Sequence, residues 1–218
     1  MKKLQCAVLA TALACVVSVS LGGTPTAVPV EAADETAKSE WECSLSTSTY
    51  FVQNGRDYAN PTLVADRDWL HLEARYNYEA IKTGSVWLGY NFSLGKKLVL
   101  EAAPMLGGVF GDITGIAPGY TLSLSYEQIE FFTQGEYFFD AGNRSGNFFY
   151  SWSELSYAPV TWFRAGIVID RTKALGSNFE VRRGPLVGFR YKKIDFTTYW
   201  LSPGSLDSTF IFTVALNF

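Results

Sequence analysis

The stretch "WLHLEARYNYE", Trp69–Glu79, has a period of two that decides between fold classes. One set of alternate positions is entirely apolar or aromatic: Leu70, Leu72, Ala74, Tyr76 and Tyr78. The set between them is entirely polar: His71, Glu73, Arg75, Asn77 and Glu79. Because successive side chains of a β-strand point to opposite faces, the stretch predicts a strand with one dry face and one charged face.

Two kinds of all-β protein need such a strand. A soluble sandwich would bury the apolar set in its core, whereas a membrane barrel would turn that set to lipid and enclose the charges in its lumen. The 218-residue chain is 48% hydrophobic and 16% aromatic, and its 18% of charged residues is below the roughly 25% of ordinary soluble domains. The composition therefore favours the barrel.

The N-terminal region has the features of an export signal. Lys2 and Lys3 precede an apolar run at 4–21, and "VEAAD" has small residues at Val30 and Ala32 that fit a cleavage site. The alternative, an uncleaved membrane anchor, is disfavoured because the run barely reaches the roughly 18 residues of a helical span. We expect a signal peptide at 1–32, a short periplasmic segment at 33–40 and a transmembrane β-barrel at 41–218.

Alternation recurs at short intervals through the rest of the chain, as in "SVWLGYNFSL" (85–94) and "STFIFTVALNF" (208–218). Turn residues separate twelve candidate strands, and ten strands are the alternative because Pro61 weakens the second candidate. The candidates are 41–53, 57–66, 69–79, 85–95, 98–108, 117–127, 129–140, 147–158, 160–172, 179–192, 194–202 and 208–218.

The connections between these strands alternate between two lengths. Very short ones fall at 67–68, 96–97, 128, 159 and 193. Longer ones, richer in Gly, Asn and Ser, fall at 80–84, 109–116, 141–146, 173–178 and 203–207. In transmembrane barrels the short turns are periplasmic and the long loops extracellular, and an even strand number returns both termini to the periplasm.

The last strand ends in Phe218 and carries Phe210, Phe212, Val214 and Leu216 on the same face. This ending resembles the C-terminal signature of bacterial outer-membrane β-barrels, in which a terminal aromatic residue is recognised by the assembly machinery. The resemblance implies a porin-like, antiparallel up-and-down barrel in the bacterial outer membrane, with no specific subfamily indicated. It also implies Phe218 as the assembly signal, and membrane lipids and the assembly machinery as partners.

Aromatic residues near strand ends are expected to form interfacial girdles: Trp69, Tyr76, Tyr78, Tyr137, Phe139, Phe189 and Tyr191. One strand does not fit a simple pattern. In "FFYSWSELSYAP" (148–159), no single parity turns Phe148, Tyr150 and Trp152 outward without turning Glu154 outward as well. Either a β-bulge interrupts this strand or its aromatic side chains point into the lumen.

Charge is distributed unevenly along the chain. Residues 41–140 contain 6 Lys/Arg and 12 Asp/Glu, whereas residues 141–218 contain 9 Lys/Arg and 5 Asp/Glu. In a closed barrel the acidic part faces the basic part, which predicts either salt bridges across a filled lumen or a transverse field across a water-filled one. The expected lumen-lining residues are Glu73, Arg75, Glu79, Glu101, Glu127, Glu136, Arg164, Arg182 and Arg190.

The sequence offers little for catalysis. After removal of the leader, the chain keeps one His, His71, expected near the periplasmic end of the lumen, and one Cys, Cys43, expected to face outward. There is no phosphate-binding loop, no metal-ligand spacing and no basic aromatic stripe for nucleic acid. We therefore expect no enzyme activity, no cofactor, no metal and no nucleic-acid partner.

The function favoured by these features is a narrow pore for small polar solutes or ions. Twelve strands predict a free bore of about 10 Å or less after inward side chains are placed. The alternative is a non-conducting structural or surface-interaction barrel with a salt-bridged, filled lumen. An outer-membrane hydrolase is the third and weakest hypothesis.

Overall fold

The structure is a computed structural model that describes residues 40–142 and 144–218. The expected signal peptide, and all but the last residue of the expected periplasmic segment, lie outside the described residues. No helix in the described part of the chain is long and apolar enough to cross a membrane. The elements are β1 (Glu42–Val52), β2 (Tyr58–Arg67), β3 (Leu70–Tyr76), β4 (Thr83–Tyr90), β5 (Phe92–Leu94), β6 (Leu98–Gly111), β7 (Gly115–Tyr126), β8 (Ile129–Asp140), the 3₁₀ turn η1 (Arg144–Gly146), β9 (Phe148–Val160), β10 (Phe163–Ala174), β11 (Glu180–Tyr191), β12 (Ile194–Leu201) and β13 (Thr209–Asn217).

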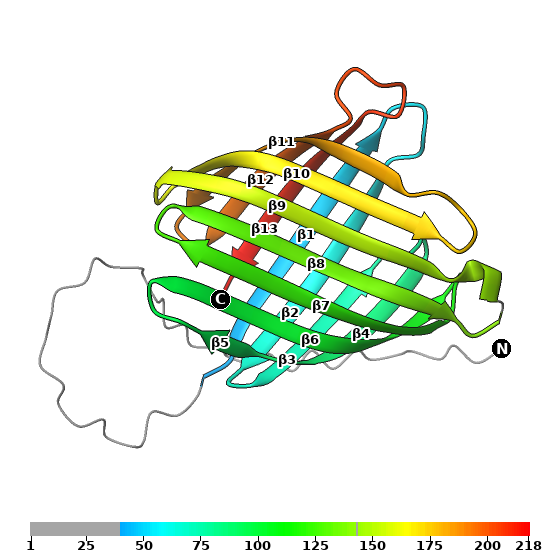
Figure 1. Cartoon of the computed structure of the whole chain (residues 1–218), viewed down its shortest axis with the longest axis horizontal. Coiled ribbons are helices and arrows are strands. Elements are labelled where there is room, and N and C mark those ends of the chain that lie inside the picture. Colours follow the sequence, from blue (N-terminus) through cyan, green and yellow to red (C-terminus); the bar gives the residue numbers. More distant parts are fainter. Residues whose placement is uncertain (1–39, 143) are drawn as a thin grey trace, which may run out of the picture.

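These strands form one closed antiparallel sheet, in which sequence order is also the order around the wall (Figure 1). β4 and β5 both pair with β6 and are separated only by Asn91, so they are two parts of one interrupted strand. The molecule is therefore an all-β, up-and-down barrel of twelve strands. This confirms the predicted fold class and strand number and excludes ten strands.

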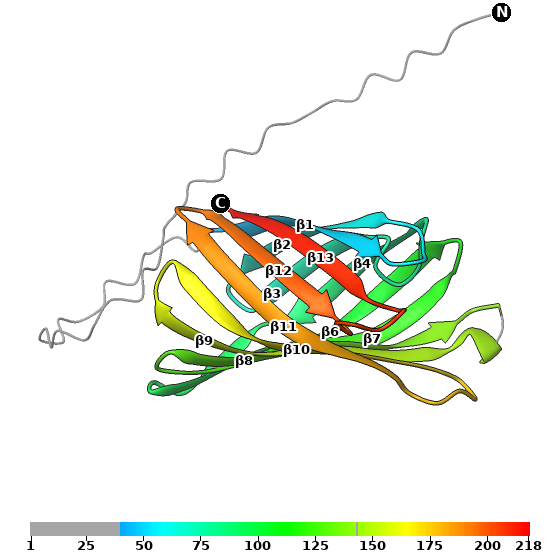
Figure 2. The same ribbon diagram turned by 90° about the horizontal axis from the view of Figure 1, so that it is seen from above.

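The barrel closes where the first strand meets the last, and Figure 2 shows β1 beside β13. At the final residue, the Cys43 N–H donates to the Phe218 carbonyl and the Phe218 N–H donates to the Cys43 carbonyl, each at 2.8 Å. The backbone of Phe218 thus takes part in the closure. Closure leaves no unpaired sheet edge along this seam.

The two ends of the barrel differ in their connections. Hairpin turns of two or three residues join the strands at one end, which we call the short-turn end, and the C-terminus also lies there (Figure 1). Asp68, Glu127 and Lys192 have φ of 53°, 54° and 55° in two-residue turns, the positive φ that tight hairpins favour. The opposite, long-loop end has connections of three to seven residues, and the loop expected at 109–116 is shortened to 112–114 because β6 and β7 extend into it.

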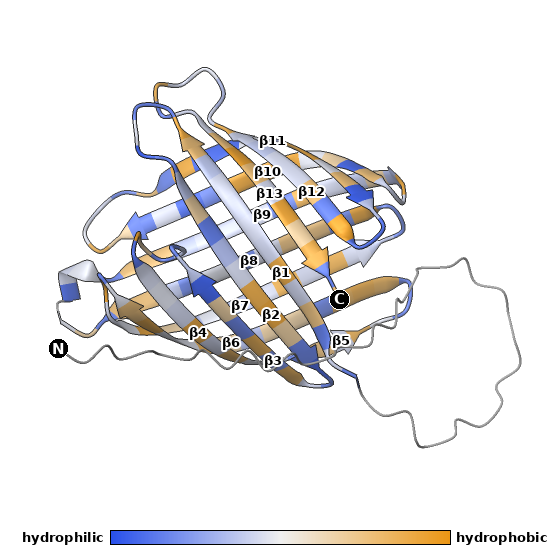
Figure 3. Ribbon diagram, turned by 180° about the vertical axis from the view of Figure 1, so that it is seen from behind, coloured by the Kyte–Doolittle hydropathy of each residue, from blue (hydrophilic) through white to orange (hydrophobic). Residues whose placement is uncertain are grey.

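The outer wall is largely apolar. On β3, Leu72 and Tyr76 are exposed on the outside while His71, Glu73 and Arg75 are buried on the inside, as the alternation predicts. Other strands follow the same rule, so that apolar segments recur along the wall (Figure 3). Soluble proteins seldom expose so many large apolar side chains, and a wall of this kind suits lipid.

The strand that did not fit a simple pattern, β9, is regularly paired with both neighbours from Phe148 to Tyr157. Its aromatic side chains point into the lumen: Phe148 stacks on Phe138 with ring centroids 5.1 Å apart, and Trp152 meets Tyr199 edge-on at 5.1 Å. Of the two interpretations, the inward one is therefore correct.

Candidate functional site

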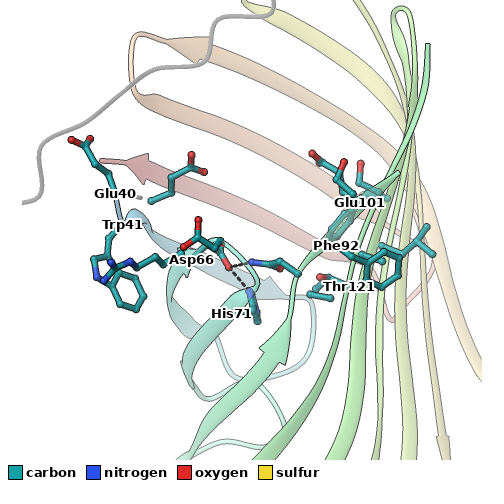
Figure 4. A pocket seen from close by; sticks show the side chains of 17 residues that line it. Glu40, Trp41, Asp66, His71, Phe92, Glu101 and Thr121 are labelled. Atoms are coloured by element: carbon teal, nitrogen blue, oxygen red, sulfur yellow. Dashed lines mark hydrogen bonds and ion pairs between the residues drawn. The ribbon is translucent and has the colours of Figure 1, made fainter. Parts of the chain in front are cut away.

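A cavity of about 980 Å³ occupies the lumen at the short-turn end, and we call it the vestibule (Figure 4). Its boundary is formed by the start of β1, the β2–β3 turn, β5 and the inner faces of β6, β7 and β8. Glu101 lies across the space from Glu40 and Asp66 (Figure 4). Carboxylates outnumber cations here, since the lining includes Glu40, Glu42, Asp66, Asp68 and Glu101 but also Arg67. The vestibule is therefore a net-acidic space, whose charge favours cations over anions.

His71 forms the inner boundary of the vestibule. Its Nδ1 lies 2.7 Å from Asp66 Oδ1, which also accepts a hydrogen bond of 2.6 Å from Asn91 Nδ2. On the other side of the ring, Nε2 lies 3.5 Å from Glu73 Oε2. The imidazole thus connects the vestibule to a buried charge cluster deeper in the lumen.

Arg75 is the centre of that cluster. Its Nε and Nη2 donate to the two oxygens of Glu73 at 2.8 and 2.9 Å, and Nη1 donates to Glu136 Oε2 at 3.0 Å. The guanidinium also lies between the rings of Tyr78 and Trp87, with Cζ 4.3 and 4.4 Å from their centroids. All three charged side chains are at most 7% exposed. Such a desolvated, fork-like pairing holds Arg75 in one geometry.

The short strand β3 explains how Tyr78 reaches this cluster. The strand ends at Tyr76 rather than at the expected Glu79, and Asn77 has φ of 57°. The Asn77 side chain donates to the Ala59 carbonyl at 2.9 Å and accepts from the Lys82 N–H at 2.7 Å, which stabilises the turn. Tyr78 is therefore directed inward, and its assignment to an interfacial girdle was wrong.

A second cavity of about 350 Å³ lies deeper in the lumen and shares His71, Thr121 and Phe132 with the vestibule. Three tyrosines line it toward the long-loop end: Tyr50 near the end of β1, Tyr78 in the β3–β4 loop and Tyr150 near the start of β9. We call them the tyrosine layer. The Tyr78 and Tyr150 rings meet edge-on at 5.6 Å, and Gln134 Nε2 donates to the Tyr78 hydroxyl at 2.8 Å.

Apolar side chains fill other parts of the lumen. One cluster projects from β9–β13 and the other from β4 and β6–β8, and Val168 and Phe138 are fully buried in them. The members are Trp152, Val168, Leu186, Tyr199, Leu201 and Ile211 in the first cluster, and Trp87, Met105, Val109, Ala117 and Phe138 in the second. Three members of the first cluster, Trp152, Tyr199 and Ile211, also line the inner cavity, so packed side chains bound the open space on that side.

The inward-facing basic residues of β10 and β11 pair with carboxylates on adjacent strands. Arg164 Nη1 donates to Glu154 Oε2 at 2.9 Å, and Glu154 Oε1 accepts hydrogen bonds from Trp152 and Tyr199 at 2.8 and 2.9 Å. Arg182 forms an ion pair with Asp170. These ion pairs keep the charged groups of both arginines close to the wall of the lumen.

The described ion pairs do not join the acidic part of the chain to the basic part across the lumen, which was one of the two alternatives considered from the sequence. Arg164, Arg182 and Arg190 pair with Glu154, Asp170 and Asp195 on neighbouring strands. The contact that spans the lumen, Arg75 with Glu136, joins β3 and β8 within the acidic part of the chain. Hydrogen-bonded neighbours are closer than opposite walls, so charges a strand apart pair first.

The predicted lumen residues occupy three kinds of position. Glu73, Arg75, Glu101, Glu136, Arg164 and Arg182 lie on the inner faces of strands. Glu79 lies in the β3–β4 loop, where it accepts a hydrogen bond of 2.6 Å from Ser85, and Arg190 lies at the short-turn rim with its side chain 62% exposed. Glu127 is an exposed residue of the β7–β8 turn, which corrects its assignment to the lumen, because a two-residue turn carries its side chains beyond the wall.

Several residues of the site were not expected from the sequence. Asp66 and Asp170 pair with His71 and Arg182, and Tyr50 lines the inner cavity. The alternation in β9 indicated where Tyr150 and Glu154 lie, since it places both residues on one face of the strand. Among the described residues, no group of three or more His, Cys, Asp or Glu side chains is placed to hold a metal ion.

Comparisons with known proteins place this geometry in a fold class. No protein-family model matches the chain, and no curated protein matches it. Two solved structures of the KdgM porin are similar, one in complex with disordered oligogalacturonate (TM-score 0.58) and one without it (TM-score 0.57); each has 9% identity and covers 80% of this chain and 99% of the porin. Pseudomonas aeruginosa OccK5 (OpdH) aligns with a TM-score of 0.42 and 9% identity, over 78% of this chain and 63% of that protein.

At 9% identity, the likeness to the KdgM porin concerns the fold. The class that the fold defines is the porin-like β-barrel, as the C-terminal resemblance implied. No particular subfamily is indicated.

Proposed function

We propose that the protein is an outer-membrane channel for small polar solutes or ions, narrowed at Arg75 and the tyrosine layer. The observation that carries this proposal is the pair of adjoining cavities inside the closed wall, about 980 and 350 Å³, both lined by a mixture of polar and apolar side chains. A porin-like fold and an apolar outer wall support it. The acidic lining of the vestibule favours cations and neutral solutes over polyanions such as oligogalacturonate.

Conductance in a planar bilayer tests the proposal. We expect low conductance from the refolded wild-type barrel and at least a severalfold increase from the Y78A/Y150A variant, because two rings leave the narrowest part of the lumen. The matched control is Y137A/Y157A, which removes two tyrosines from the outer face and should conduct like the wild type. Absence of conductance from all three barrels would contradict the channel, and equal conductance of all three would contradict its narrowing at the tyrosine layer.

The second candidate is a non-conducting structural barrel, and the two packed apolar clusters in the lumen favour it. In that case Y78A/Y150A lowers the stability of the barrel without opening a path for ions. Urea midpoints measured on the same preparations separate the two candidates. That the chain is not an enzyme and binds no nucleic acid stays a prediction.

We also propose that the short-turn end faces the periplasm, on the basis of the loop asymmetry. A cysteine at the exposed Ser145 in the β8–β9 connection should react with an impermeant thiol reagent on intact cells, whereas a cysteine at Lys96 should react only after the envelope is opened. The C43S background removes the native thiol of the described chain. Labelling at position 96 on intact cells would reverse the orientation.

The assembly machinery remains a proposed partner through Phe218. Because its main chain pairs with Cys43, an F218D substitution keeps the closing hydrogen bonds and changes only the side chain. We expect reduced insertion with normal export, measured as loss of heat-modifiable barrel from the membrane fraction. Normal amounts of folded F218D barrel would remove Phe218 as the assembly signal.

A further inference from the structure

Charges that face outward are rare on the described strands. By the alternation of each strand, they are Arg171 and Lys173 on β10 and Arg183 on β11. Arg67, at the last position of β2, lies at the rim beside the Trp41 ring and also lines the vestibule. No Asp or Glu of the described strands faces outward. Since the outer wall is otherwise apolar, three cations on two adjacent strands need an explanation.

The register places these three side chains together. Arg183 is opposite Ile169 and Val181 is opposite Arg171, so Arg171 and Arg183 are diagonal neighbours on one face, roughly 7–8 Å apart at their backbones. Lys173 follows two positions after Arg171 on the same face, and its Nζ lies 4.9 Å from the Phe179 ring centroid. We call Arg171, Lys173 and Arg183 the outer cation cluster, and it lies toward the long-loop end.

The outer cation cluster has no carboxylate partner among the described residues. The nearby acidic groups Asp170 and Glu180 both contact Arg182, which points inward from between Val181 and Arg183. The positive charge of the outer face is therefore uncompensated by the protein. Next to lipid, an anionic head group is the compensating group that charge complementarity requires.

A hollow of about 580 Å³ on the outer wall adjoins Arg171. Its floor is low because Thr133, Ser151 and Ser153 are small. The hydroxyls of Thr133 and Ser153 lie 3.0 Å apart, and Thr133 also donates to the Trp152 carbonyl at 3.1 Å, so these two polar groups already have partners. Aromatic and aliphatic side chains form its sides: Tyr120, Phe131, Phe149, Phe179 and Val181. A hollow with a low floor and apolar sides fits a hydrocarbon chain.

From this arrangement we propose a binding site for one phosphorylated lipid, with its phosphate on the outer cation cluster and an acyl chain in the hollow. Arginine forks suit phosphate oxygens, and the adjoining hollow adds apolar contact that free phosphate lacks. A second copy of the chain fits less well, because a two-fold contact would bring the same three cations together. The site rests on the proposed membrane location but is independent of conduction.

Native mass spectrometry of the refolded barrel in detergent tests the site with a matched pair of lipids. Dioleoyl phosphatidic acid carries the phosphate and dioleoylglycerol lacks it, with identical acyl chains. We expect selective binding of phosphatidic acid, and a loss on the order of fivefold in affinity for each cation replaced by Gln, or on the order of 100-fold for R171Q/K173Q/R183Q. R171K/R183K keeps the charges and should retain most of the binding.

The matched control is R56Q/K82Q/K96Q, which removes the same net charge from exposed connections and should bind like the wild type. Heat-modifiable mobility of every variant on gels confirms that the barrel is folded. Equal binding of both lipids, equal losses in the two triple variants, or displacement of the lipid by millimolar inorganic phosphate would each overturn the proposal. Dimers in place of lipid adducts would instead assign the face to a second copy. A barrel that conducts but shows no preference for phosphatidic acid would contradict the lipid site and would not affect the proposal that the protein is a channel.

Discussion

Two inward arginines, Arg75 and Arg190, show how position in the barrel changes the contribution of an ion pair to stability. The Arg75 side chain is 4% exposed and lies between two carboxylates and two aromatic rings. The Arg190 side chain is 62% exposed at the short-turn rim and pairs with Asp195 at 2.7 Å. Both ion pairs have short distances, but only the first is removed from water. Desolvation, and not distance, therefore decides what each pair contributes.

The largest effect on stability is expected at Arg75. In R75M, the buried carboxyl groups of Glu73 and Glu136 lose their guanidinium partner, so we expect the free energy of unfolding to fall by about 3–5 kcal/mol. Urea unfolding of the barrel in lipid vesicles, followed by tryptophan fluorescence, measures this loss. A loss below about 1 kcal/mol would mean that water enters the cluster and that Arg75 resembles Arg190.

The triple variant R75M/E73Q/E136Q tests whether the loss of stability in R75M comes from the carboxylates that are left without a partner. Removing all three charges leaves no unpaired ion, so we expect its loss of unfolding free energy to be clearly smaller than that of R75M alone. The same urea titration serves for both proteins. If the triple variant is less stable than R75M, the cluster stabilises the barrel by more than relief of buried charge.

Arg164 represents an intermediate case, since its side chain is 32% exposed but its partner Glu154 is only 7% exposed. In R164M, Glu154 keeps hydrogen bonds from Trp152 and Tyr199, so we expect a loss of about 1–3 kcal/mol. Comparison with R164M/E154Q, in which the carboxylate is also neutral, isolates the cost of the stranded charge. A loss as large as that of R75M would show that the two hydrogen bonds compensate nothing.

The smallest effect is expected at the rim. R190Q removes a solvent-exposed ion pair, so the free energy of unfolding should change by less than about 1 kcal/mol, and the change should diminish further in 1 M salt. Urea midpoints at low and high salt measure it. A large, salt-insensitive loss would show that Arg190 is shielded from water in the membrane.

Local pattern was sufficient to predict the wall of the barrel. The period of two in 69–76, repeated along the chain, assigned apolar residues to the outside and charged residues to the inside, and twelve such segments gave the strand number. Parity even restricted Phe148 and Trp152 to one face with Glu154. These properties depend only on neighbouring residues, because side chains alternate at every step of a strand.

The closed structure alone decided which inward residues meet. Arg75 and Glu136 are 61 positions apart, and their contact depends on how the tilt and stagger of the strands bring β3 opposite β8. Tyr78 enters the lumen because Asn77 turns the chain at φ of 57°, so that the strand ends at Tyr76, three residues before the expected Glu79. The sequence by itself determined the face of each strand residue and hence the barrel; the tertiary structure decided the ion pairs, the tyrosine layer and the two cavities, since contacts across a lumen depend on the position of every strand between them.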